Sequence, residues 1–238
     1  MRRIPDSWRG RAFVLTVAGC VQFVVLTLVA MVLYPGGTVA DPTTRGYSFF
    51  HNFFSDLGRT HTPAGQPNSA SFLLFTVALA LAGAGLILFF VASLRFFTAS
   101  RPARWLSRLG CLFGIASGSG LIGVAFAPAD QSLGIHGWFV LLAFQAFLPA
   151  VLAFLAAILL SKGYPRRYAL VYLAYAVLLA GYVILLRAGP SSATPGGLVV
   201  QAAGQKVIVY AGIGCVLIQA WGARRLARGG SLRVRIYS

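Results

Sequence analysis

The chain has few charged residues, and acidic residues are especially scarce. Only 10% of its 238 residues are charged, and Asp and Glu together number four. Soluble domains carry about 25% charged residues, so the composition excludes an ordinary soluble domain. Apolar residues make up 58% of the chain and the mean hydropathy is +0.79, which is typical of a protein whose surface faces lipid.

Cysteine is also scarce, since the chain contains only Cys20, Cys111 and Cys215. Their number is odd and their spacing matches no metal-binding motif. All three lie inside or at the edge of apolar runs, which favours a role as small buried hydrophobic side chains.

The apolar residues form blocks that are long enough to cross a bilayer of roughly 30 Å as helices of about 20 residues. The blocks are continuous and do not alternate as barrel strands do. We therefore expect an all-α, polytopic membrane protein with one bundle of six transmembrane helices. The expected spans are residues 12–34, 71–97, 109–127, 137–161, 168–186 and 198–221, between a basic N-terminus (1–11) and a basic tail (222–238). The first run is longer than the core of a signal peptide, which favours a retained signal anchor.

The basic residues alternate with the expected spans. Sixteen of the twenty Lys and Arg residues lie in the N-terminus, in the second-to-third and fourth-to-fifth connections, and in the tail. The other four are Arg45, Arg59, Arg187 and Lys206. The positive-inside rule then predicts a multi-pass protein of the cell membrane (inner or plasma) with both termini cytoplasmic. Anionic lipid headgroups explain the net charge of +16, so we expect no nucleic-acid partner.

The connection of residues 35–67 is the longest polar segment and contains an aromatic-rich stretch. Within residues 47–57, most apolar side chains share one helical face, and Asn52 and Asp56 lie four residues apart on another. We expect a short helix here that lies at the interface or re-enters the bundle, and Gly58 would end it. The third span contains Gly114-x-x-x-Gly118, which lets another helix approach closely and predicts a place at the bundle centre.

Two polar patches, residues 51–58 and 128–136, fall on the expected outer side of the membrane. The candidate catalytic residues there are Asp56, Asp130, His136, His51 and Ser55. A divalent metal is the candidate cofactor, with His51, Asp56 and His136 as ligands. A spacing of five residues does not place His51 and Asp56 on one helical face, so such a site needs either a bend in the chain or ligands from the second patch, where Asp130 and His136 lie. Each residue taken singly is also explained as a loop residue or a helix cap.

Further polar and aromatic residues are candidates for binding a substrate. They are Asn52, Asn68, Phe53, Phe54, Gln145, Tyr172 and Lys206. Lys206 lies inside a span and needs either an acidic partner, Asp56 or Asp130, or a path to the interface. Residues Gln145, Tyr172, Tyr175, Gln201, Gln205 and Tyr210 would either line a polar cavity or form interhelical hydrogen bonds and an aromatic belt. We favour the second interpretation.

Three motifs together resemble a known family. They are His51-Asn52-x-x-Ser55-Asp56-Leu57-Gly58, Asn68-x-x-Ser71-x-x-x-Phe75 and Pro128-x-Asp130-x5-His136. The chain resembles, over residues 12–220, the prokaryotic membrane family catalogued as domain-of-unknown-function 998, which is distantly similar to FRAG/DRAM-like proteins. The resemblance implies a six-helix bundle with a shared polar set of Asn52, Ser55, Asp56, Asn68, Asp130 and His136. The apolar stretch 124–127 departs from the pattern, which has a glycine close to the proline.

Three functions are consistent with these features. The first is an integral membrane enzyme that acts on a lipid or isoprenoid through the Asp/His patches, either as a lipid hydrolase or as an acid-initiated terpenoid cyclase, with metal-assisted or general acid/base chemistry. The alternative is a non-catalytic structural or lipid-binding protein. A small transporter ranks third, because ionisable residues deep in the spans are almost absent. The expected partner is a membrane lipid or isoprenoid, and the oligomeric state is left open.

Overall fold

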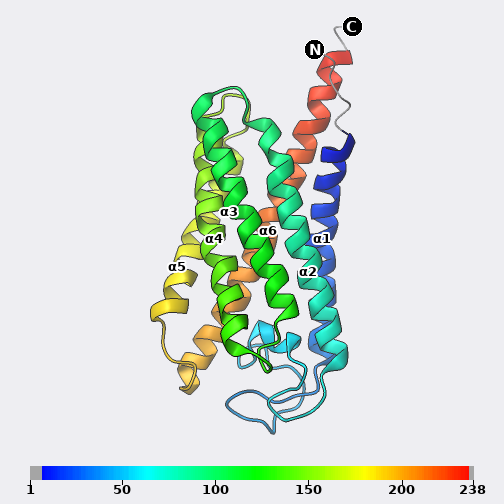
Figure 1. Ribbon diagram of the computed structural model, residues 1–238, viewed down its shortest axis with the longest axis vertical. Helices are drawn as coiled ribbons and strands as arrows, with labels where there is room; N and C mark the ends of the chain where they lie inside the picture. The colour runs from blue at the N-terminus through cyan, green and yellow to red at the C-terminus, as the bar shows by residue number, and fades with distance from the viewer. Residues whose placement is uncertain (1–6, 236–238) are drawn as a thin grey trace.

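Six long helices dominate the computed structural model, which describes the backbone of residues 7–235 and the side chains of residues 8–227 (Figure 1). They are α1 (Ser7–Leu33), α2 (Ser69–Ser93), α3 (Arg101–Phe126), α4 (Leu133–Leu159), α5 (Arg167–Ala188) and α6 (Pro195–Arg235). Two 3-10 helices accompany them, η1 (Phe54–Gly58) and η2 (Leu94–Phe96). All six long helices are long and apolar enough to cross a membrane, which confirms the predicted fold class. Parts of the expected basic termini, residues 1–6 and 236–238, lie outside the described residues.

Several helices extend beyond the predicted spans. Helix α3 begins at Arg101, well before the predicted start at residue 109, and α6 continues into the predicted tail. Ser100 caps α3, because its hydroxyl accepts a hydrogen bond from the Ala103 N–H at 3.3 Å. An apolar run marks only the segment in hydrocarbon, whereas backbone hydrogen bonding continues among the basic residues beyond it.

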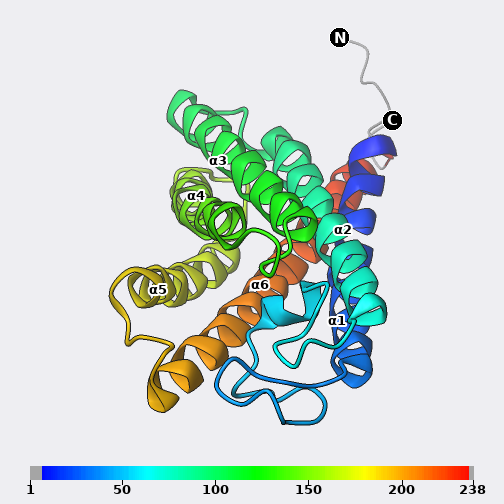
Figure 2. The ribbon, with the colours of Figure 1, turned by 60° about the horizontal axis from the view of Figure 1, so that its bottom comes forward.

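The six helices form a closed ring (Figure 2). Each helix packs against its neighbours in the sequence, and α6 returns to pack against α1. The prediction that α3 lies at the bundle centre is wrong, because α3 packs between α2 and α4 and exposes Trp105 and Leu112. Its glycines allow close packing against these two neighbours: Gly118 lies against α2, and Gly120 lies against α4.

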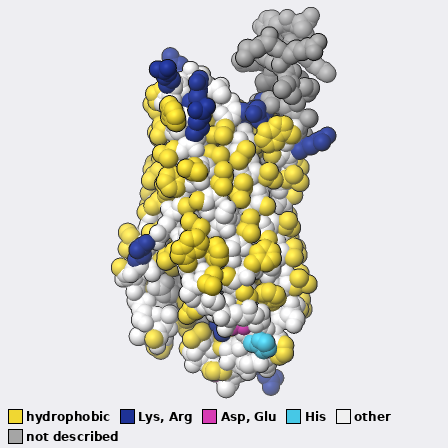
Figure 3. All heavy atoms as spheres, viewed as in Figure 1, with side chains coloured by type: hydrophobic (Ala, Val, Ile, Leu, Met, Phe, Trp, Pro, Cys, Tyr) yellow, Lys and Arg dark blue, Asp and Glu magenta, His cyan; other side chains and the backbone are white. Residues whose placement is uncertain are grey.

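The two ends of the ring differ in charge (Figure 3). Most of the visible Lys and Arg side chains lie at the end where α3 begins, here called the basic end, whereas the visible Asp and His side chains lie toward the opposite, loop end. Trp8, Trp105 and Trp221 are exposed near the basic end, and each ring contacts an arginine of its own helix at 5.2 to 5.6 Å. Exposed tryptophans beside arginines are typical of a membrane interface.

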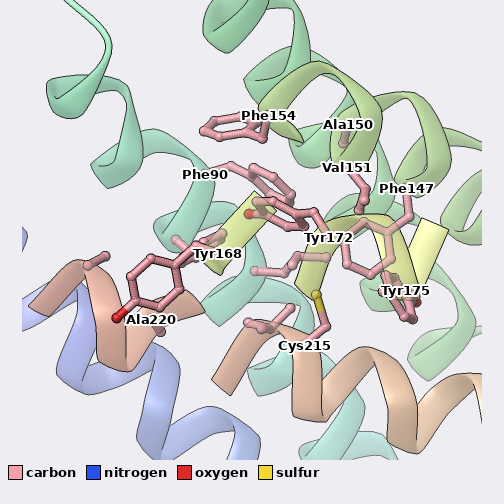
Figure 4. Packing of buried hydrophobic residues seen from close by; sticks show 14 of the residues in the cluster. Phe90, Phe147, Ala150, Val151, Phe154, Tyr168, Tyr172, Tyr175, Cys215 and Ala220 are labelled. Atoms are coloured by element: carbon pink, nitrogen blue, oxygen red, sulfur yellow. The ribbon is translucent and has the colours of Figure 1, made fainter. Parts of the chain in front are cut away.

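Aromatic side chains fill the half of the ring nearer the basic end, and Figure 4 shows part of this packing from close by. Phe90 of α2 lies 5.2 Å from Phe154 of α4 between ring centroids, and Phe154 lies 6.4 Å from Tyr172 of α5. This packed half fills the ring toward the basic end. The candidate site lies between it and the loop end.

Candidate functional site

The connection between α1 and α2, residues 34–68, folds over the loop end of the ring and is here called the cap (Figure 2). Its η1 helix dips into the bundle, where Phe54 is 3% exposed and Leu57 fully buried. The Phe54 ring stacks on Phe23 of α1 at 5.7 Å and lies 5.9 Å from Phe75 of α2. The helix expected over residues 47–57 is thus limited to five residues, and it re-enters the bundle. Preceding residues form turns instead, in which Asn52 Oδ1 accepts a hydrogen bond from the Ser48 N–H at 2.9 Å.

Asp56 is 3% exposed, and hydrogen bonds within the cap occupy its carboxyl group. Its Oδ2 accepts hydrogen bonds from Asn52 Nδ2 at 3.2 Å and from the Phe53 N–H at 2.8 Å. Its Oδ1 lies 4.0 Å from Arg59 Nη1. Burial raises the pKa of Asp56 above its ordinary value, although the Asn52 hydrogen bond and the Arg59 charge oppose the rise. The carboxyl therefore holds the first turn of η1 in place.

Two buried amides also support the backbone of the cap. Asn68 Nδ2 donates to the carbonyl oxygens of Leu57 at 3.2 Å and Arg59 at 2.9 Å. Asn52 Nδ2 donates to the Gly37 carbonyl oxygen at 2.9 Å. The sequence marked both amides as substrate-binding residues, but in the structure they satisfy carbonyl groups of the loop.

Asp130 ties the α3–α4 connection to the cap. Its carboxylate accepts hydrogen bonds from the Thr60 N–H at 3.0 Å, the Thr60 hydroxyl at 2.6 Å and the His61 N–H at 3.0 Å. Partial burial raises the pKa of Asp130, but these hydrogen bonds outweigh burial and hold it below its ordinary value. The two polar patches of the sequence therefore do meet, at a carboxylate that binds backbone.

The histidines of the two patches do not combine with Asp56 or Asp130 in a metal site. His136 is buried and its Nδ1 lies 2.7 Å from the Ala127 carbonyl oxygen, at the end of α3 where helical carbonyls lack partners. His51 is exposed and contacts the Ser48 hydroxyl at 3.0 Å. Among residues 8–227, no group of three His, Cys, Asp or Glu side chains could hold a metal ion. The structure therefore does not assemble the predicted ligand set of His51, Asp56 and His136.

Helix α6 holds the cap through two adjacent side chains. Lys206 is fully buried, and its Nζ donates hydrogen bonds to the carbonyl oxygens of Asn52 and Ala202. The same Nζ lies 5.4 Å from the Tyr47 ring centroid and 5.2 Å from that of Phe49. Within the described chain it forms no salt bridge with Asp56 or Asp130, because carbonyl groups and aromatic faces replace the expected acidic partner. Next to it, Gln205 Oε1 accepts a hydrogen bond from the Phe54 N–H at 2.6 Å.

An apolar cavity lies directly beneath η1, inside the ring. The volume open to the centres of water-sized molecules is about 100 Å³. All six helices line it, with residues such as Cys20, Leu86, Val140, Phe147 and Val216.

Only two of the predicted site residues, Phe54 and Ser55, line this cavity. Gln205 and Tyr175 also line it, although the sequence favoured interhelical hydrogen bonds for both. Gln145 and Tyr172 do not line it, and among the described residues the buried Gln145 Nε2 and Tyr172 hydroxyl have no hydrogen-bond partner. Phe53, half-buried in the cap, is not in its wall either.

A family model with the description "Protein of unknown function (DUF998)" matches residues 17–222. The chain belongs to the DUF998 family. The DUF998 match includes the cap, η1 and every residue of the cavity wall except Thr16. Searches of curated proteins and of solved structures found no match.

Proposed function

We propose that this DUF998 protein binds a lipid or isoprenoid chain in the cavity beneath its cap. The observation that carries this proposal is the cavity itself, with its volume of about 100 Å³ and a wall drawn from all six helices and from η1. Cavities with apolar walls stay dry and bind hydrocarbon groups. Phe54 and Ser55 of the cap form its wall at the loop end, so the cap would shield this end of a bound chain from water.

The polar motifs support binding better than acid/base catalysis. The Asp56 carboxyl group is directed to Asn52 and the Phe53 N–H, and Asp56 is not part of the cavity wall. Asp130 likewise binds the backbone of Thr60 and His61. A hydrolase or a cyclase that uses either carboxyl group would first have to release the cap. The non-catalytic hypothesis therefore ranks first and the enzyme second.

Transport is supported least. Among the described residues that line the cavity there is no Asp, Lys, Arg or His. Ion-coupled transporters use such residues within their spans.

We also propose that the protein lies in the cell membrane with its loop end outside. The support is the distribution of cations, which crowd the basic end (Figure 3). Cytoplasmic loops carry the excess of Lys and Arg in most multi-pass proteins.

Lipid analysis of the purified protein tests the proposal. The wild-type chain, extracted in mild detergent, should carry a co-purifying lipid that native mass spectrometry detects. Ala82 lines the cavity, so Ala82→Phe fills space and should remove that lipid. Ala18 is exposed on α1, and Ala18→Phe is the matched control that should retain it. Equal lipid content in all three proteins would contradict the proposal.

A further inference from the structure

The cavity wall contains no charge that could pair with a charged headgroup. Its residues include no acidic residue and no lysine, arginine or histidine. The nearest candidate by position is Lys206, beside Gln205, but its ammonium group is fully buried against two carbonyl oxygens and two aromatic rings. A charge placed in an apolar interior without a partner is strongly disfavoured. The wall thus selects against carboxylate, phosphate and ammonium groups.

Two polar side chains of the wall, those of Thr16 and Ser117, are already paired. The Thr16 hydroxyl donates to the Ala12 carbonyl oxygen at 2.9 Å, and the Ser117 hydroxyl donates to the Ala143 carbonyl oxygen at 2.8 Å. Both bonds lie within the helical wall, so these groups present little hydrogen-bonding capacity to a ligand.

Two uncharged groups at the cap end of the cavity remain available, one on the cap and one on α6. Ser55 belongs to η1 and Gln205 faces it from α6, and both line the cavity. Among the hydrogen bonds of the described residues, none involves the Ser55 hydroxyl or Gln205 Nε2. Because Gln205 Oε1 accepts from the Phe54 N–H, the amide nitrogen is the end left free, and it can only donate. A third polar group, the Tyr175 hydroxyl, lies deeper, beside Gly212.

We infer that the ligand is an uncharged lipid with a hydroxyl or carbonyl oxygen at the end next to the cap. Ser55 and Gln205 donate hydrogen bonds to that oxygen, and the hydrocarbon extends toward Phe147 and Val216. This inference rests on the proposed function, because it names the ligand of the same cavity.

The size of the cavity limits the length of the chain. Along α6 the wall runs from Gln205 to Val216, a rise of about 16 Å. A volume of about 100 Å³ open to water-sized centres holds on the order of ten non-hydrogen atoms. A short isoprenoid alcohol matches both dimensions.

Three ten-carbon probes separate the headgroup from the hydrocarbon: geraniol, geranyl phosphate and the hydrocarbon myrcene. Binding to the full-length protein in lipid nanodiscs is measured by displacement of a photoreactive geraniol analogue. Geraniol should bind more tightly than myrcene, and geranyl phosphate should not compete. Ser55→Ala should weaken geraniol binding about fivefold to tenfold, the effect of one hydrogen bond, and leave myrcene unchanged. Ser119 is exposed on α3, and Ser119→Ala is the control that changes neither.

The outcomes also separate this inference from the proposed function. If geranyl phosphate competes as well as geraniol, or if Ser55→Ala does not change geraniol binding, the inference of an uncharged headgroup is wrong. The proposal that the cavity binds a hydrocarbon chain would still stand. If neither geraniol nor myrcene competes, and the photoreactive analogue labels the Ala82→Phe variant as strongly as the wild type, the proposed function itself is wrong.

Discussion

At the scale of single residues, the polar motifs act on the backbone of the cap. Four of their side chains form hydrogen bonds with main-chain atoms of residues 37–61. They are the side chains of Asn52, Asp56, Asn68 and Asp130. Buried backbone groups need such partners, since an unpaired one costs about 1–3 kcal/mol. The motifs thus explain why a 35-residue connection keeps one conformation over an apolar cavity.

Asp130→Asn should destabilise the protein in a pH-dependent way. The pKa of Asp130 is lowered by its hydrogen bonds to Thr60 and His61, so its contribution is present above the ordinary Asp pKa and is lost as pH falls through the lower, folded value. At pH 7 we expect a loss of about 1 kcal/mol, because a neutral amide accepts fewer of these bonds. Thermal unfolding in detergent checks this: the unfolding temperature of the wild type should exceed that of the variant at pH 7, and the gap should be smaller at an acidic pH below the ordinary Asp pKa of about 4. A gap of equal size at both pH values would contradict this role.

The site could be predicted only in part at this scale. The sequence identified the polar residues of both patches, and their residue types predicted that they would be paired or functional. It did not show that the partners are carbonyl and N–H groups of the loop, because Asp130 and Thr60 are far apart in the chain and meet only through the fold. Lys206 shows the same limit, since its two aromatic partners and the Asn52 carbonyl oxygen lie more than 150 positions away.

At the scale of elements, close contacts of α3 set the width of the ring. A Cβ atom at Gly120 would lie 2.6 Å from the backbone nitrogen of Ala143 in α4. Because this clash is with backbone, rotation of a neighbouring side chain would not relieve it. The six long helices were predictable because each contains an apolar run of membrane length. The 3-10 helix η1 was less predictable from the sequence. Its buried Phe54 ring and the hydrogen bonds of Asp56 override the amphipathic pattern of residues 47–57.

Gly120→Ala should separate α3 from α4 and lower stability. We expect a loss of about 1–3 kcal/mol, the usual effect of overpacking. Gly214 of α6 is the control, because a Cβ atom there would meet nothing within 4 Å. Unfolding temperatures of Gly120→Ala and Gly214→Ala, compared in one detergent, measure the difference. Similar temperatures for the two variants would mean that the α3–α4 contact is not tight.

At the scale of the whole molecule, ring closure creates the cavity. Helix α6 packs against α1, and η1 lies at the loop end, so residues of all six helices and of η1 line one cavity between the cap and the packed aromatic half. This closure joins the first and last helices of the bundle. Apolar runs give the number of helices but not their neighbours, and for this reason the cavity could not be predicted from the sequence.

The orientation of the ring is testable with single cysteines. Cys20, Cys111 and Cys215 are all buried, so background labelling should be low. Ser191→Cys adds a thiol at the loop end and Lys162→Cys one at the basic end, both at exposed positions. A membrane-impermeant maleimide should label Ser191→Cys in intact cells, and Lys162→Cys only after permeabilisation. The reverse pattern would place the loop end in the cytoplasm.

The most direct test of lipid binding is a structure of the protein taken from its own membrane into nanodiscs, at a resolution that shows lipid. We predict elongated density inside the ring that begins beside Ser55 and Gln205 and ends near Val216, without a charged headgroup. A cavity that holds only ordered water, or that side chains fill, would contradict the account.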